Sequence, residues 1–217
     1  MATTSRGVGA VKRKVSAFLE AQLPNYLAGL RQTWGVTTAE IPDIVEFNHN
    51  PPRALDVWPM VAVSATGMPG LGRTEYVPDP TSGGITEVHY STRYDLRVFV
   101  WVREEGWDRV IDVRDDLTAA VRTLLVDRPT FGDPAEVILL DESTVVEEYS
   151  DVQQVKGERF VAGSIIGFEA DVHEIVGRVA TVINDDGDEQ LPVVDDAILH
   201  ADNQIPPPFV PFAHPAL

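Results

Sequence analysis

Three residues whose side chains can exchange protons stand at alternate positions within the segment 159–176: Glu169, Asp171 and His173. The segment alternates apolar and polar residues, which predicts a β-strand that carries all three side chains on one face. A carboxylate beside an imidazole is suited to general acid–base catalysis, so the trio fits a small hydrolase or transferase. A strand face that is simply exposed to water has the same pattern, and both interpretations stay open at this point.

A group of acidic and amide side chains surrounds Gly187, as in a calcium-binding loop: Asn184, Asp185, Asp186 and Asp188. If Gly187 is the turn glycine of an EF-hand, Val182 and Val193 occupy the first and last ligand positions. Neither side chain has an oxygen that could bind calcium. We therefore expect a turn here, which would close a small hairpin between 179–183 and 190–194.

The other motifs of enzyme chemistry are incomplete. Gly70 and Gly72 begin like a dinucleotide-binding loop, but Glu75 stands where the third glycine belongs, and an extended segment follows in place of a helix. The chain has no Gly-x-Ser-x-Gly elbow and no cysteine nucleophile. We expect a protein that is not an enzyme, with no catalytic residues, no cofactor and no bound metal.

The elements around which the chain is organised occupy the segment 87–125. Residues 90–102 alternate, which predicts a long strand with one buried face and one largely wet face that carries Arg93, Asp95 and Arg97. After a polar break, apolar residues recur at helical spacing up to Leu125 and predict an amphipathic helix. Because arginine suits interface ion pairs, we expect Arg93, Asp95 and Arg97 to make subunit contacts.

An apolar stripe in 7–35 predicts an N-terminal helix that is kinked or divided at Pro24 and stops at Gly35. Its basic residues Lys12 and Arg13 form either a solvated helix face or a docking surface for an acidic partner. We also assign them to the expected subunit interface.

The remaining segments predict strands separated by breaks rich in glycine and proline. Strands are expected at 41–48, 57–66, 137–140, 143–152 and 159–176, with a long loop or hairpin extension at 67–84. Gly163 and Gly167 indicate a bulge or a close backbone approach in the last of these strands. The proline-rich end, 205–217, predicts an extended arm that lies on a surface of its own subunit or of a neighbour. We assign its Phe209 and Phe212 to the expected subunit interface.

The expected fold is therefore α+β, with the N-terminal helix and one central helix packed on a mostly antiparallel sheet. The expected organisation is a domain at 1–177, followed by a hairpin and an extended C-terminal arm at 178–217.

The formal net charge is −17, and the segment 133–151 contains no lysine or arginine. Such a protein is unsuited to holding nucleic acid by neutralising its phosphates. No apolar run is long enough to span a membrane, so we expect no membrane partner. The acidic residues of this segment that we single out as a candidate surface are Glu142, Glu147 and Glu148.

The order of these features resembles the tail terminator proteins of long-tailed, siphovirus-like bacteriophages. The resemblance covers residues 8–176 and rests on layout: a basic helix, short strands, a long loop, the run 94–102 (YDLRVFVWV), a helix from Trp107 and Asp108, an acidic hairpin and a second long strand. Other neck proteins, such as a head–tail connector or stopper, share much of this layout and remain the alternative.

The resemblance implies a structural virion protein at the head–tail junction, made in the host cytoplasm. Six copies would form a homo-oligomeric ring that binds the tail-tube protein, ends tube polymerisation and meets the head–tail connector proteins. DNA would pass through the lumen without specific binding. Glu142, Glu147 and Glu148 would then line that lumen and repel phosphate.

Overall fold

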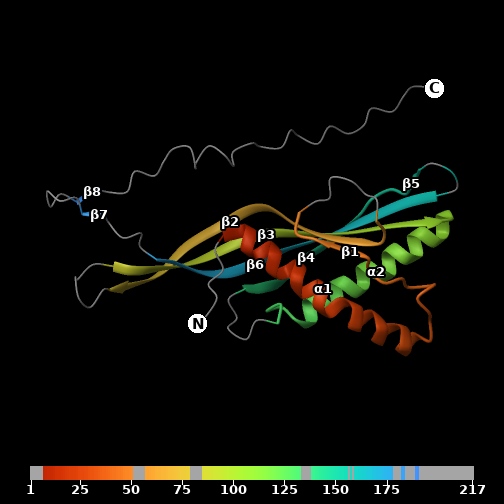
Figure 1. Ribbon diagram of the computed structural model, residues 1–217, viewed down its shortest axis with the longest axis horizontal. Helices are drawn as coiled ribbons and strands as arrows, with labels where there is room; N and C mark the ends of the chain where they lie inside the picture. Colours follow the sequence, from red (N-terminus) through yellow and green to blue (C-terminus); the bar gives the residue numbers. More distant parts are fainter. Residues whose placement is uncertain are drawn as a thin grey trace, which may run out of the picture. The chain divides into compact units, whose positions relative to one another are not determined.

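The computed structural model describes residues 7–50, 57–78, 85–132, 138–155, 157, 159–177, 182–183 and 189–190. Contacts divide the chain into one unit that spans Met1–Gly177 and a second that spans Arg178–Leu217. The described part of the first unit contains two helices and a six-stranded, mostly antiparallel sheet (Figure 1). The expected α+β fold is confirmed.

The two helices are α1 (Gly7–Trp34) and α2 (Trp107–Asp127). The strands of the sheet, in chain order, are β1 (Glu46–Asn48), β2 (Met60–Pro78), β3 (Ile85–Glu105), β4 (Ile138–Tyr149), β5 (Gln153–Gln154) and β6 (Arg159–Gly177). In space the order is β1-β2-β3-β6-β4, with β5 beside β6. Only β1 and β2 pair in parallel, so the sheet is built mainly from antiparallel neighbours.

The pairing of β3 with β6 forms the centre of the sheet. Its register is unbroken from Glu87 opposite Gly177 to Glu105 opposite Arg159. Because side chains alternate along a strand, the even-numbered residues of both strands share one face. Leu96 and Phe168, which pair across the two strands, are buried on this face, as the alternation predicted.

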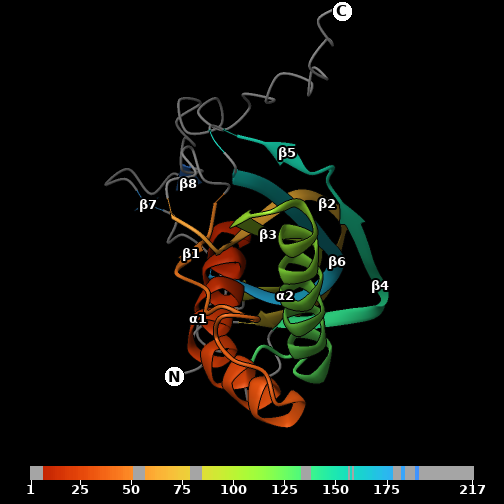
Figure 2. The ribbon, with the colours of Figure 1, turned by 90° about the vertical axis from the view of Figure 1, so that its right-hand side faces the viewer.

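Both helices lie on that same face of the sheet (Figure 2). The buried residues of α1 recur every three or four positions, as do those of α2, so each helix turns an apolar stripe toward the sheet. Burying one valine or leucine stabilises a fold by roughly 1.5–3 kcal/mol. The fully buried residues of the two stripes are Val11, Val15, Leu19, Leu23 and Leu27 of α1, and Val110, Val113, Leu117 and Val121 of α2.

The expected division of the first helix at Pro24 is wrong in one respect, because α1 is a single helix with Pro24 inside it. Pro24 is exposed, whereas Leu23 and Leu27 on either side are fully buried. Their packing keeps the helix continuous although proline lacks the amide hydrogen that the helix would use. The expected stop at Gly35 is confirmed, since Gly35 adopts a φ of 69° directly after the last helical residue.

The expected loop at 67–84 is also wrong over most of its length, and the hairpin alternative applies. β2 continues to Pro78 and pairs with β3, while residues 79–84 lie outside the described part. The register shifts between Ala65 and Gly67, and again between Gly67 and Gly70. Such bulges accommodate extra residues within a strand, so the glycines here do not end β2. The strands expected at 137–140 and 143–152 are one strand, β4, whose register with β6 shifts between Asp141 and Val146.

In the second unit, Val182 pairs with Gln190 and Ile183 with Glu189, which forms β7 (Val182–Ile183) and β8 (Glu189–Gln190). The residues between these strands lie outside the described part of the chain. The proline-rich segment 205–217, with Phe209 and Phe212, lies outside it as well.

A half-buried carboxylate links the beginning of α1 to the sheet. Glu174 of β6 accepts hydrogen bonds from the Gly7 amide (2.9 Å), the Tyr94 hydroxyl (3.0 Å) and the Thr92 hydroxyl (2.9 Å). A carboxylate at this position complements the positive end of the helix dipole. Burial and the neighbouring Glu174 raise the pKa of Tyr94 to about 12, so its hydroxyl remains a donor at neutral pH.

Replacing Glu174 by alanine should lower the free energy of unfolding by about 2 kcal/mol, because each hydrogen bond to a charged group contributes roughly 1.5–3 kcal/mol. Chemical denaturation measures this loss, and hydrogen exchange should show faster exchange in the first turn of α1. Glu20→Ala is the matched control, since Glu20 is exposed on the same helix. Equal unfolding free energies for the two variants would contradict the role of Glu174.

Candidate functional site

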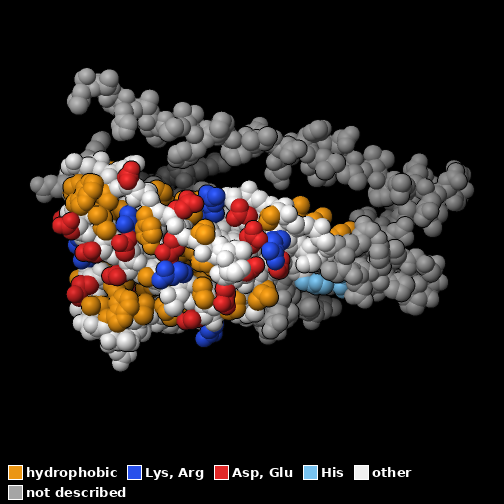
Figure 3. Space-filling model, turned by 180° about the vertical axis from the view of Figure 1, so that it is seen from behind, with side chains coloured by type: hydrophobic (Ala, Val, Ile, Leu, Met, Phe, Trp, Pro, Cys, Tyr) orange, Lys and Arg blue, Asp and Glu red, His pale blue; other side chains and the backbone are white. Residues whose placement is uncertain are grey.

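The face of the sheet that the helices leave uncovered is called the open face here, and it carries the odd-numbered residues of β3 and β6. It bears acidic, basic and apolar side chains interspersed with one another (Figure 3). Three of the residues expected at subunit contacts, Arg93, Asp95 and Arg97, lie on it, and each is half-buried. The open face is therefore the surface on which the predicted contact residues meet.

Arg93 is the centre of a charged cluster on the open face. Its guanidinium donates two parallel hydrogen bonds of 2.8 Å to the carboxylate of Asp171. It also reaches Glu169 at 3.2 Å and Asp141 of β4 at 3.7 Å. The hydrogen bonds to Asp171 are the main reason that the pKa of Arg93 is raised. One arginine thus joins three carboxylates from β6 and β4. Its two parallel hydrogen bonds to Asp171 are a bidentate geometry that lysine cannot reproduce.

The acid–base trio is divided between two sets of partners. Asp171 and Glu169 bind Arg93, while Nε2 of His173 lies 3.2 Å from Nδ1 of His89. The three side chains share a strand face, as predicted; two of them bind the same arginine and the third lies beside a histidine of β3. The arrangement favours the other interpretation of the same pattern, a charged strand face.

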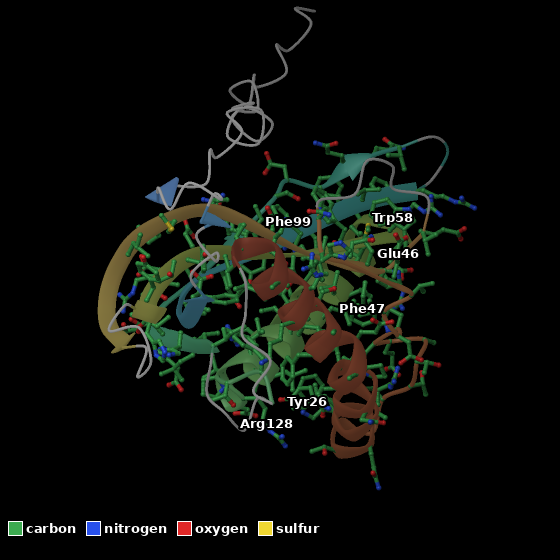
Figure 4. The ribbon with its side chains drawn as sticks, turned by 60° about the vertical axis from the view of Figure 1, so that its left-hand side comes forward. Tyr26, Glu46, Phe47, Trp58, Phe99 and Arg128 are labelled. Atoms are coloured by element: carbon green, nitrogen blue, oxygen red, sulfur yellow. The ribbon has the colours of Figure 1, made fainter. Side chains whose placement is uncertain are left out.

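The apolar end of the open face is built around Trp101. A β-carbon added to Gly163, its partner on β6, would lie 2.7 Å from Cε3 of the indole ring, so the ring covers this glycine closely. Phe99 and Ile165 pair beside it, and both are half-buried. Phe99 of β3 is labelled in Figure 4. The predicted close approach at Gly163 is thus present, and the register of β3 and β6 has no bulge there.

The three acidic residues proposed to share a surface do not point the same way. Glu147 pairs with Ile166 on the helix side, where it accepts hydrogen bonds from Arg122 of α2 (3.0 Å) and from the Tyr149 hydroxyl (2.7 Å). Burial and Glu147 raise the pKa of Tyr149 to about 12. Glu148 is the neighbour of Glu147 on the strand, so it belongs to the open face. Glu142 is exposed in the irregular part of β4.

Two basic residues expected at an interface lie away from the open face, on α1. The Lys12 ammonium donates a hydrogen bond of 2.7 Å to the side chain of Asn50, and Arg13 is exposed. Tyr26 of α1 and Arg128, which follows α2, also belong to the helical layer (Figure 4). The structure therefore separates Lys12 and Arg13 from Arg93, Asp95 and Arg97.

A group of arginines at the end of the sheet was missed by the sequence analysis. Arg103 of β3, Arg109 of α2 and Arg159 of β6 line a hollow of about 460 Å³ together with Glu104 and Glu105. They are far apart in the sequence. Bringing Arg103 and Arg159 together requires the register in which Glu105 lies opposite Arg159. That register could be predicted only if the end of β3 and the beginning of β6 were known to the residue.

No model of a known protein family matches the chain, and no curated protein matches it either. Among the described residues, no group of three or more histidine, aspartate or glutamate side chains could hold a metal ion. Within the same residues, neither helix has both the length and the apolar character needed to cross a membrane.

Gly163→Ala should lower the free energy of unfolding by roughly 1–3 kcal/mol, because the new methyl group would displace Trp101. Thermal or chemical denaturation measures the loss. Adding Trp101→Ala should recover part of it, since the clash is removed. Additive losses in the Gly163→Ala and Trp101→Ala double variant would contradict the close contact.

Gly29 of α1 offers a control, because a β-carbon added there has no atom within 4 Å. Gly29→Ala should therefore raise the free energy of unfolding by up to about 1 kcal/mol.

The carboxylate of Asp141 should make the stability depend on acidic pH. Hydrogen bonds from the Ser143 hydroxyl and amide, and then the charge of Arg93, hold its pKa below the ordinary value of 3.8. A lowered folded-state pKa contributes stability that is complete above the ordinary pKa and is lost as the pH falls through the lowered value. Asp141→Asn should thus be less stable than the natural chain at neutral pH, and the difference should shrink as the pH falls below about 4. Urea titrations across this range test this, and a difference that is independent of pH would contradict it.

Proposed function

We propose that this chain is a structural ring protein of a bacteriophage head–tail junction, and specifically a tail terminator of a long-tailed phage. In this role it is not an enzyme. Six copies form a ring on the last ring of tail-tube subunits, end the polymerisation of the tube and present a surface to the head–tail connector proteins. DNA passes through the lumen without specific binding. The protein assembles in the host cytoplasm and resides at the head–tail junction of the virion.

The observation that carries this proposal is the construction of the open face. Arg93 is held by cross-strand ion pairs with Asp171 and Glu169, and exposed apolar side chains such as Val146 stand on the same face. Protein interfaces combine well-ordered arginines and aromatic residues with a polar surround. The open face has this composition, and its carboxylates are engaged with Arg93 in a way that suits a contact surface better than proton transfer.

The extension of the sheet supports the same function. β2, β3 and β6 continue together past the ends of both helices (Figure 1). Met68 and Leu71 of β2 are more than half exposed. Such an extension offers neighbouring subunits a long surface while the helical layer keeps the core of each subunit closed. The expected layout of a basic helix, two long strands and an intervening helix is the remaining support.

The proposal is tested by electron microscopy of virions in which this chain carries a gold label or an antibody. We expect the label at the junction between head and tail, because a terminator stays on the end of the tube. Label on the capsid shell or on the distal tip of the tail would contradict the proposal. A binding assay with the tail-tube protein separates a terminator from a connector or stopper, since only the terminator must bind the tube.

A further inference from the structure

The end of the sheet where α2 begins carries three arginines, beside Glu104 and Glu105, and among the described residues only one of the three arginines has an ion pair. We call Arg103, Arg109, Arg159 and Trp107 the arginine surface. Arg159 is exposed and makes no ion pair with a described residue, and Arg103 lies over the ring of Trp58, 5.5 Å from its centre, instead of against a carboxylate. Arg109 is 3.4 Å from Glu104 and also donates to the carbonyl of Ala39.

An exposed tryptophan begins α2 at the same end of the sheet. Trp107 is 51% exposed and meets Phe160 only edge-on, with 5.8 Å between the ring centres. Tryptophan and arginine are the residue types that most often dominate the binding energy of protein interfaces. The arginine surface therefore combines the exposed positive charge of Arg159 with a large apolar side chain that another molecule could cover.

A second surface, on the open face, has the opposite charge. We call the hollow between β3, β6 and β4 the acidic hollow, with Asp95, Glu148, Glu169 and Val146 as its defining residues. Its volume is about 220 Å³, and Arg97 is the one described cation in its lining. Asp95 and Glu148 make no ion pair with a described residue.

Gly167 and Val146 form one wall of the acidic hollow. Gly167 lies in its lining, where an added β-carbon would meet the side chain of Val146 at 3.1 Å. Val146 is 56% exposed, so the hollow has an apolar rim beside its carboxylates. A long cationic side chain would find both a carboxylate for its charge and an apolar wall for its methylene groups.

One copy of the chain cannot bring these two surfaces together. The arginine surface lies at the pair of Glu105 with Arg159, whereas the acidic hollow surrounds the pair of Arg97 with Gly167. Eight residues along a strand separate the two pairs by about 26 Å. A contact between the two surfaces therefore needs a second molecule.

We propose that copies of this chain associate head to tail, with the arginine surface of one copy docked into the acidic hollow of the next. Arg159 enters the hollow beside Glu148, and Trp107 covers Val146. The partner is a second copy because both complementary surfaces are present on the same chain. Contacts between two different surfaces generate a closed ring when the rotation between copies closes. This inference rests on the proposed ring function and supplies its subunit contact.

The contact changes the expected role of Glu148. A residue docked against Arg159 of the next copy is covered by protein, so it does not line a channel for DNA. Of the three acidic residues assigned to the lumen, Glu147 is bound to Arg122 and Glu148 belongs to the contact. Glu142 is then the only one of the three that stays exposed.

Charge reversal of the full-length chain tests this contact, with native mass spectrometry and sedimentation velocity over a concentration series. Arg159→Glu alone and Glu148→Arg alone should each weaken association roughly tenfold or more, because like charges then face each other. The two changes in one chain restore an opposite pair at every contact and should recover association. Raising the salt concentration should weaken the natural assembly, since exposed ion pairs are screened.

Two variants serve as controls, and circular dichroism confirms that every variant is folded. Arg128→Glu and Glu20→Arg also reverse exposed charges but lie outside both surfaces, so they should assemble like the natural chain. A natural chain that forms rings while Arg159→Glu and Glu148→Arg assemble normally would overturn the contact and leave the ring function in place. Failure of the double variant to recover would overturn the pairing of Arg159 with Glu148. A natural chain that stays monomeric, alone and with tail-tube protein, would overturn the ring as well.

Discussion

The unbroken pairing of β3 with β6 is the constraint on which the rest of the structure depends. It sets which residues face the helices and which form the open face, because a shift of one residue would exchange the two sets. With Leu96 and Phe168 on the covered side, Arg93 and Asp171 must meet on the other side. The core and the charged cluster are therefore two consequences of one register. The link from Glu174 to the first turn of α1 ties the helical layer to the same strand pair.

The fold was predictable where burial produces a clear period. Alternation in 90–102 and helical spacing after Trp107 identified β3 and α2 because each element buries one continuous face. Prediction failed where packing overrides a local signal. Pro24 stays inside a helix because Leu23 and Leu27 are buried on both sides of it. The glycines of β2 predict either a loop or a hairpin extension, and the sequence does not choose between them because the register shifts at these glycines depend on the partner strand β3.

The surface was predictable only in part, for a similar reason. Alternation placed Arg93, Asp95 and Arg97 on one face, but it could not show that Arg93 joins Asp171, Glu169 and Asp141. Such contacts depend on cross-strand register, which a single sequence does not specify. The same limit applies to Glu147, which is adjacent to Glu148 in the chain yet turns toward Arg122. The arginine surface is the extreme case, because its members come from two strands and a helix.

A chain whose two faces are divided in this way, with a closed helical layer and an open charged sheet, is suited to association with copies of itself. The central proposal is that copies of the chain form a ring on the end of the tail tube. Negative-stain electron microscopy of the purified chain mixed with tail tubes tests it most directly. We predict a closed ring with a central channel, seated on one end of each tube and absent from its sides. Tubes that keep growing in the presence of the chain, with no ring at either end, would contradict the claim.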